Sequence, residues 1–160
     1  MQTRKLFAAS ILLLFTTCAQ GQQERRSVLL PESEAKAVAA MYPKSGPSRI
    51  TGTWEPTNAD IDGLEANLHQ ISGLSLKGKL PWIQIEHPEN YFRQYIGVLQ
   101  AGNKRIYINA FCGFNGNQPP SSPVWRNRLF IISDGGSCAW QSLYDPSSKK
   151  FIELRINGIA

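Results

Sequence analysis

Two histidines, with the acids beside them, are the residues of this chain best suited to acid–base chemistry near neutral pH. His87 lies next to Glu86 and two residues before Glu89 in a polar segment. A general base or a single metal ligand there gives one hypothesis, a small secreted hydrolase with a site around His87 and Glu86. His69 can face Glu65 one turn back on a predicted helix, where an exposed ion pair is the simpler interpretation.

The remaining sequence offers no nucleophile paired with a base. It contains no Gly-x-Ser-x-Gly elbow, phosphate-binding loop or histidine-rich metal pattern. Paired carboxylates for glycoside hydrolysis must lie about 5–10 Å apart across a cleft, and no pattern places two acids in that way. We therefore expect no cofactor, no metal site and no catalytic residue, and we favour a binding protein over an enzyme.

The first 21 residues have the organisation of a secretory signal. Two basic residues precede an apolar run from Leu6 to Phe15 that is too short to span a bilayer, and Ala19-Gln20-Gly21 forms a small-x-small cleavage site. We expect a mature chain that begins at Gln22, lacks a transmembrane segment and resides in the periplasm or outside the cell. A lipoprotein anchored through Cys18 is the less favoured alternative, because bulky residues precede that cysteine.

Two cysteines, Cys112 and Cys138, remain after this cleavage. An even pair in an exported chain predicts a disulfide, which would stabilise the fold by about 3.5 kcal/mol in the chain-entropy model. Two buried thiols are the alternative. Without partnering histidines, the two cysteines make a poor zinc set.

The charge of the chain does not indicate a nucleic-acid partner. Cleavage would reduce Lys+Arg from 17 to 15 against 12 acids, a net charge of +3. The basic residues are scattered and lack the aromatic interleaving of a nucleic-acid groove. The mature length suits one domain with its own core.

The stretch from Leu129 to Gly158 organises the predicted fold. Three runs rich in β-branched and aromatic residues are separated by Gly135-Gly136 and by Asp145-Pro146-Ser147-Ser148, which favour turns. We predict a three-stranded antiparallel meander in which residues 129–134 and 138–144 pair across the two glycines.

One face of this meander mixes aromatic and polar residues, as binding surfaces do. In the predicted register Arg155 lies opposite Trp140, where a guanidinium can stack on an indole, and Tyr144 lies opposite Phe151. The alternative is a second core layer covered by residues 28–41. The predicted binding residues are Trp140, Tyr144, Phe151, Arg155 and Trp125, the last at the exit of a loop rich in Gly, Asn, Pro and Ser.

Upstream, Thr57 and Asp60 resemble a capping box. Apolar residues then recur at helical spacing, at Ile61, Leu64, Leu68 and Ile71. We predict that this main helix packs on the meander face opposite Trp140.

Shorter elements complete the prediction. Residues 50–54 alternate like a strand, and Gly102-Asn103 is a natural turn between strands at Tyr91–Ala101 and Lys104–Cys112. Residues 22–49 are expected to be a flexible segment with a short helix from Pro31 to Met41.

The predicted fold class is α+β, with one main helix on an antiparallel meander sheet of about five strands. A single α+β domain is expected to span residues 50–160.

Motifs in the second half of the chain resemble a family of small exported bacterial proteins of unknown function. They are Tyr91-x-Arg93-Gln94-Tyr95-x-Gly97, residues 106–112, Asp134-Gly135-Gly136 with Trp140, Tyr144-Asp145-Pro146 and Asn157-Gly158-Ile159-Ala160. The resemblance covers roughly residues 54–160 and implies an exported domain without indicating an activity. The order of helix and meander is similar to that of cystatin-like folds, in architecture only.

Together these features predict an exported, non-catalytic binding module. It would be of an inhibitor or immunity type and act on another protein in the cell envelope or outside the cell. The alternative is the hydrolase around His87 and Glu86.

Overall fold

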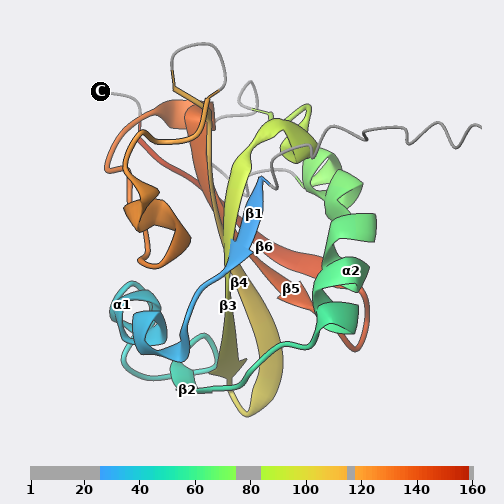
Figure 1. The fold of residues 1–160 in the computed structure, drawn as a ribbon. Helices are drawn as coiled ribbons and strands as arrows, with labels where there is room; N and C mark the ends of the chain where they lie inside the picture. Colours follow the sequence, from blue (N-terminus) through green and yellow to red (C-terminus); the bar gives the residue numbers. More distant parts are fainter. Residues whose placement is uncertain (1–25, 75–83, 115–117, 159–160) are drawn as a thin grey trace, which may run out of the picture.

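The computed structural model describes residues 26–74, 84–114 and 118–158, and the predicted signal peptide lies outside them. The described residues form a mixed α+β fold with a mostly antiparallel six-stranded sheet and few helices (Figure 1). The strands are β1 (Ser27–Leu29), β2 (Ile50–Thr53), β3 (Phe92–Gln100), β4 (Asn103–Phe111), β5 (Ala139–Asp145) and β6 (Lys150–Ile156). The α-helices are α1 (Ala35–Ala40) and α2 (Asn58–Ala66), and 3-10 turns lie at Glu32–Glu34, Leu68–Gly73, Pro88–Asn90, Pro123–Arg126 and Gly136–Cys138.

The sheet is an antiparallel meander, β3-β4-β5-β6, with two short strands added at one edge. β1 runs parallel to the first half of β3, and β2 runs antiparallel to its second half. β3 therefore has neighbours on both sides along most of its length.

The β3–β4 hairpin turns one residue earlier than predicted. Ala101 and Gly102 occupy the turn with positive φ angles of 48° and 79°, so Ile96 faces Tyr107 instead of Asn109. This register differs from the predicted one by two residues. Because side chains alternate with a period of two, the predicted grouping of side chains on the two faces is unchanged.

The predicted pairing of residues 129–134 with β5 is wrong. These residues form no strand, and β5 pairs with β4 and β6. Gly135 and Gly136 do take positive φ angles, of 115° and 54°, but they lead into a 3-10 turn before β5. The backbone of residues 128–132 makes hydrogen bonds to side chains instead, as described below.

Helix α2 begins as predicted, but it packs on the face of the sheet opposite to the predicted one. Thr57 and Asp60 form the full capping box, with the Thr57 amide donating to Asp60 Oδ2 at 2.9 Å. The predicted stripe is buried at Leu64, Leu68 and Ile71, the last two in the 3-10 turn that follows the helix. It lies against a core cluster that includes Tyr95, Ile106, Ile108, Trp140 and Tyr144. The prediction that this helix packs on the face opposite Trp140 is therefore wrong. The helix covers the face that carries Trp140 and Tyr144.

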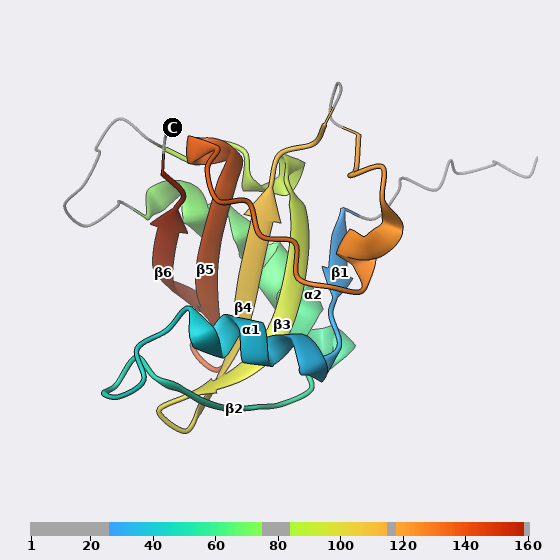
Figure 2. The same ribbon diagram turned by 90° about the vertical axis from the view of Figure 1, so that its left-hand side faces the viewer.

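The opposite face of the sheet is covered by the N-terminal residues. Leu30, Val38 and Tyr42 pack into a second core cluster with Ile96, Val98, Tyr107 and Leu143. Figure 2 shows α1 on one side of the sheet and α2 on the other. The short helix predicted after Pro31 is present as α1. Leu30, Ala35, Val38 and Tyr42 are buried, so residues 30–42 are packed against the sheet, whereas residues 43–49 are exposed.

The predicted disulfide between Cys112 and Cys138 is present. It links the end of β4 to the residue before β5 with a Cα–Cα distance of 4.9 Å. Beside it, the Cys112 amide donates to the Cys138 carbonyl at 2.8 Å, so the covalent link extends the β4–β5 ladder. No helix among residues 26–74, 84–114 and 118–158 combines the length and apolar character that crossing a membrane requires.

Gly97 in β3 allows the chain before α2 to cross the sheet at close range. A Cβ atom at this position would lie 2.7 Å from Pro56 Cδ and closer still to the Trp54 carbonyl oxygen. The Trp54 indole holds the crossing in place, because its Nε1 donates to the Arg105 carbonyl at 2.9 Å.

We predict that Gly97→Ala lowers the free energy of unfolding by about 2 kcal/mol or more, because backbone atoms must move to admit the methyl group. Urea denaturation measures this change. Gly73→Ala is the control, since no atom lies within 4 Å of its Cβ position. Equal effects of the two substitutions would contradict the close crossing at Gly97.

Candidate binding groove

Four of the five predicted binding residues lie in the core. Trp140, Tyr144 and Phe151 have exposed fractions of 0%, 1% and 5% beneath α2 and the turn that follows it, and Trp125 is buried in a separate cluster. The predicted face is thus a core layer, but the element that covers it is α2 and not residues 28–41. These aromatic side chains form no exposed patch.

Arg155 does not stack on Trp140. A register shift between Leu143 and Tyr144 makes Ile152 an extra residue in β6, so Trp140 lies opposite Ile156. The Arg155 guanidinium lies 4.1 Å from the centre of the Tyr42 ring on the other side of the sheet, and it pairs with Glu153. Tyr144 pairs with Phe151 as predicted, because this pair lies between the hairpin turn and the register shift.

His87 is exposed on the turn before β3. Its Nδ1 lies 3.2 Å from Glu89 Oε1, and it shares a hollow of about 490 Å³ with Glu86, Tyr91 and Cys112. The Tyr91 hydroxyl donates to the Ser137 carbonyl at 3.0 Å. Among the described residues, no group of three or more His, Cys, Asp or Glu side chains is placed to hold a metal ion.

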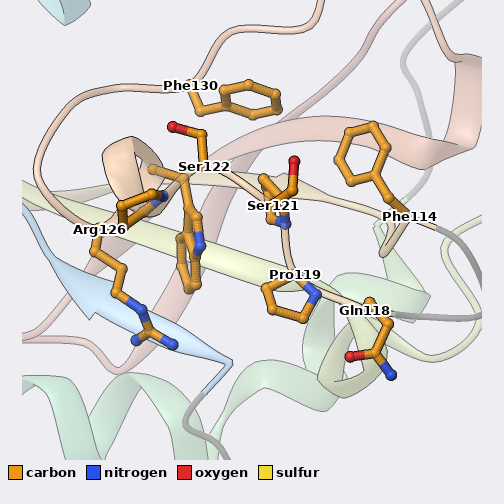
Figure 3. A pocket seen from close by; sticks show the side chains of 10 residues that line it. Phe114, Gln118, Pro119, Ser121, Ser122, Arg126 and Phe130 are labelled. Atoms are coloured by element: carbon orange, nitrogen blue, oxygen red, sulfur yellow. The ribbon is translucent and has the colours of Figure 1, made fainter.

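A hollow with a volume of about 710 Å³ lies on the loop between β4 and β5 (Figure 3). We call it the aromatic groove. It is lined by Phe114, Gln118, Pro119, Pro120, Ser121, Ser122, Pro123, Trp125, Arg126 and Phe130. Apolar rings dominate this lining, and its polar side-chain groups are two hydroxyls, one amide, one guanidinium and the indole N–H of Trp125.

Edge-to-face aromatic contacts form the base of the groove. Trp125 packs on Phe92 and Phe111 with ring centres 5.5 and 6.0 Å apart. Phe130 contacts Phe111 at 5.1 Å and Phe114 at 6.2 Å. Each such contact adds about 0.5–1.5 kcal/mol to the burial of the rings. The rings of the loop are thereby fixed to the ends of β3 and β4.

Side-chain amides of the sheet hold the same loop by hydrogen bonds. The buried Gln94 donates from Nε2 to the carbonyls of Trp125 and Arg128, and its Oε1 accepts from the Phe130 amide at 2.9 Å. The neighbouring Asn109 donates from Nδ2 to Gln94 Oε1 and to the Phe130 carbonyl, at 2.8 and 2.7 Å.

The row of amides continues across the sheet. Gln141 in β5 donates to Asn109 Oδ1 at 3.4 Å and to Asn157 Oδ1 at 3.2 Å. Asn157, after the end of β6, donates to the Ile132 carbonyl. Figure 2 shows the loop before β5 crossing the strands on this side. We call Gln94, Asn109, Gln141 and Asn157 the amide row.

Gln94 and Asn109, the two buried members of the amide row, are a strong constraint on the loop. An amide withdrawn from water without a partner costs about 1–3 kcal/mol, so the loop and the row each require the other. The sequence carried a partial signal, because Gln94, Asn109 and Gln141 occupy inward positions of predicted strands, where polar residues are uncommon. It did not indicate that their partners are backbone groups of the loop.

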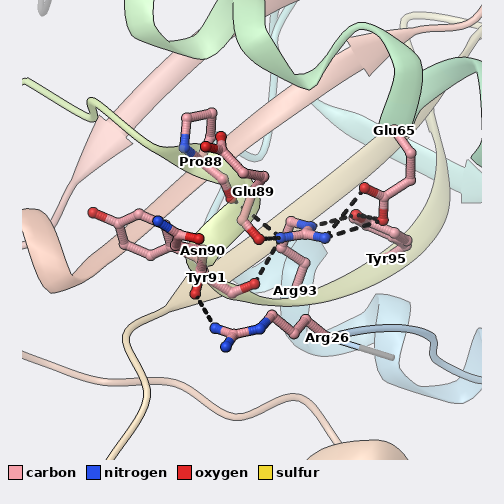
Figure 4. A network of polar contacts seen from close by, with 8 residues as sticks. All are labelled: Arg26, Glu65, Pro88, Glu89, Asn90, Tyr91, Arg93 and Tyr95. Atoms are coloured by element: carbon pink, nitrogen blue, oxygen red, sulfur yellow. Dashed lines mark hydrogen bonds and ion pairs between the residues drawn. The ribbon is translucent and has the colours of Figure 1, made fainter. Parts of the chain in front are cut away.

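A second polar network has a structural role (Figure 4). The buried Arg93 donates to the carbonyls of Pro88, Glu89 and Tyr91, to the Tyr95 hydroxyl and to Glu65, whose Oε2 lies 3.2 Å away. The Tyr95 hydroxyl donates to Glu65 at 2.6 Å, and burial raises the pKa of Tyr95, which keeps this donor protonated. The network ties the turn before β3 to α2.

Comparisons of the chain with protein-family models, curated proteins and solved structures found no match. The choice among the candidate sites therefore depends on their geometry. The aromatic groove combines a volume of about 710 Å³, an apolar lining and a base held by two independent sets of contacts. It is the candidate site that the structure supports best.

We predict that Gln94→Met lowers the free energy of unfolding by about 2–4 kcal/mol, because three backbone groups of the loop and Asn109 lose their partner. Thermal or urea denaturation measures this loss. Gln141→Met, in the same row but with bonds of 3.2–3.4 Å, should cost about 1 kcal/mol. An equal cost for the two substitutions would show that Gln94 does not anchor the loop.

We also predict that Tyr144→Ser lowers the free energy of unfolding by about 3–4 kcal/mol, because it leaves a cavity under α2 and removes a hydrogen bond to the Gly63 carbonyl. Ile152→Ser should change it by less than about 1 kcal/mol, since that side chain is 47% exposed. If Tyr144→Ser left the stability unchanged, the face that carries Trp140, Tyr144 and Phe151 would again be a candidate binding surface.

Proposed function

We propose that the protein is an exported, non-catalytic binding module of an inhibitor or immunity type that recognises another protein through the aromatic groove. The observation that carries the proposal is the groove of about 710 Å³ itself, in which apolar rings surround a few polar groups. This composition is typical of ligand sites, and a base held by buried contacts lowers the entropy cost of binding.

The surroundings of the groove favour a macromolecular partner. Phe114 in the lining and Val124 beside it are 43% and 50% exposed, so apolar surface extends beyond the hollow. Exposed apolar surface around a central pocket is a property of protein-binding sites. The disulfide is compatible with an oxidising compartment, which agrees with the expected export.

The test is affinity capture from cell-envelope and culture-medium fractions with the mature protein and with the double variant Phe114→Ser, Val124→Ser. Both side chains are exposed, but Phe114→Ser also removes the ring contact with Phe130, so we expect a loss of about 1–2 kcal/mol in unfolding free energy and a loss of partner binding of roughly tenfold or more. Ile152→Ser, on β6, is the control and should bind as the unmodified protein does. A partner captured equally well by the double variant would refute the groove as the binding site.

A further inference from the structure

We propose that the outer edge of β6 pairs with β6 of a second copy of the chain, so that two sheets join through antiparallel strands. This surface is separate from the aromatic groove, and the inference does not depend on the proposed function. Three features of β6 carry it: the uncovered half of its edge, the direction of its backbone groups and the order of its charges.

Only the first half of the β6 edge carries features that prevent strand pairing. Within the described part of the chain, β6 ends the strand order, with β5 as its one neighbour. Gln70 covers the start of the edge, because its Oε1 accepts from the Phe151 amide at 3.4 Å and its Nε2 donates to the Lys149 carbonyl at 3.1 Å. The bulge at Ile152 follows. Side-chain covers and bulges keep edge strands from pairing, and among the described residues the second half of β6 has neither.

The hydrogen bonds to β5 determine which backbone groups of β6 point away from the sheet. The Asn157 amide donates to the Ala139 carbonyl at 2.9 Å, so Asn157 turns toward β5. Because this direction alternates along an antiparallel strand, Arg155 also turns toward β5, whereas Leu154 and Ile156 turn outward. Within the described residues, the outward N–H and C=O groups of these two residues have no hydrogen-bond partner. Such groups are a template for another strand.

The order of charges makes the β6 edge complementary to itself. Glu153 and Arg155 have side chains that are 27% and 38% exposed, and Arg155 lies on the face that α1 covers. If two antiparallel β6 strands meet with their Leu154 residues opposite each other, Glu153 lies opposite Arg155 of the second copy on both sides of the two-fold axis. A register with Leu154 opposite Ile156 would instead place two arginines opposite each other. Opposite charges stabilise a cross-strand pair and like charges destabilise it, so the charges favour the first register.

Pairing through β6 leaves both aromatic grooves accessible. Figure 2 shows β6 at one edge of the sheet and the turn Pro123–Arg126, which lines the groove, at the other. Two joined chains therefore present two grooves, which raises the avidity for a partner with repeated sites. Because Gln70 and the bulge limit the paired length, we expect weak association, with a dissociation constant on the order of 0.1 mM.

The first experiment measures amide hydrogen exchange by NMR on the folded, disulfide-bonded protein at two concentrations. We expect the Leu154 amide to exchange roughly threefold more slowly at about 1 mM than at about 50 µM, because it donates to the second copy. The amides of Glu153 and Arg155 are the internal control, since they turn toward β5 and should be protected equally at both concentrations. Exchange of Leu154 that does not depend on concentration would overturn the inference, because the edge would then stay open or be closed by its own chain.

Charge variants test the register by sedimentation. Glu153→Arg and Arg155→Glu should each weaken self-association by roughly tenfold, and their equimolar mixture should restore it, because each variant supplies the charge that the other lacks. Glu153→Arg retains the contact of Arg155 with Tyr42, so its result does not depend on how Arg155→Glu affects the fold. Lys36→Glu, on the exposed side of α1, is the control and should associate as the unmodified protein does. Unchanged association of both single variants, or a mixture that fails to associate, would overturn the inference and leave the proposed function standing.

Discussion

The hydrogen bonds from Gln94 and Asn109 to the loop before β5 are the constraint on which the rest of the structure depends. Residues 128–132 cross the sheet without a neighbouring strand, yet their backbone groups must be satisfied where they are buried. The two side-chain amides take the place of that missing strand. Because they fix the loop at Phe130, the rings of Trp125 and Phe130 pack on Phe111, and the aromatic groove forms above them.

Coverage of the sheet determines which surfaces of the protein stay exposed. Helix α2 and the turn after it bury one face, whereas α1 and the residues that flank it, among them Leu30 and Tyr42, bury the other. Sheets that carry large apolar side chains on both faces require such double coverage. The exposed aromatic surface is consequently displaced to the loop between β4 and β5. The Cys112–Cys138 disulfide joins the strand ends from which that loop departs and returns.

Local sequence patterns predicted much of this fold. They did not predict which face of the sheet α2 covers or which residues pair with β5. The capping box at Thr57, the β3–β4 and β5–β6 hairpins and the disulfide were all legible in the sequence. Alternation showed which side chains share a face, but it carries no information on which face α2 covers. The bulge at Ile152 moved Arg155 away from Trp140 and has no sequence signature. Residues 129–134 have strand composition, and their hydrogen bonds to side chains, among them Gln94, Asn109 and Glu34, take the place of strand pairing.

Amide hydrogen exchange at Phe130, followed by NMR, tests most directly whether the amide row holds the loop. The Phe130 N–H donates to Gln94 Oε1 at 2.9 Å, although Phe130 belongs to no strand. We predict that it exchanges as slowly as the paired amides of β4 and much faster after Gln94→Met. Exchange in the unmodified protein at the rate of a solvent-exposed amide would contradict the account.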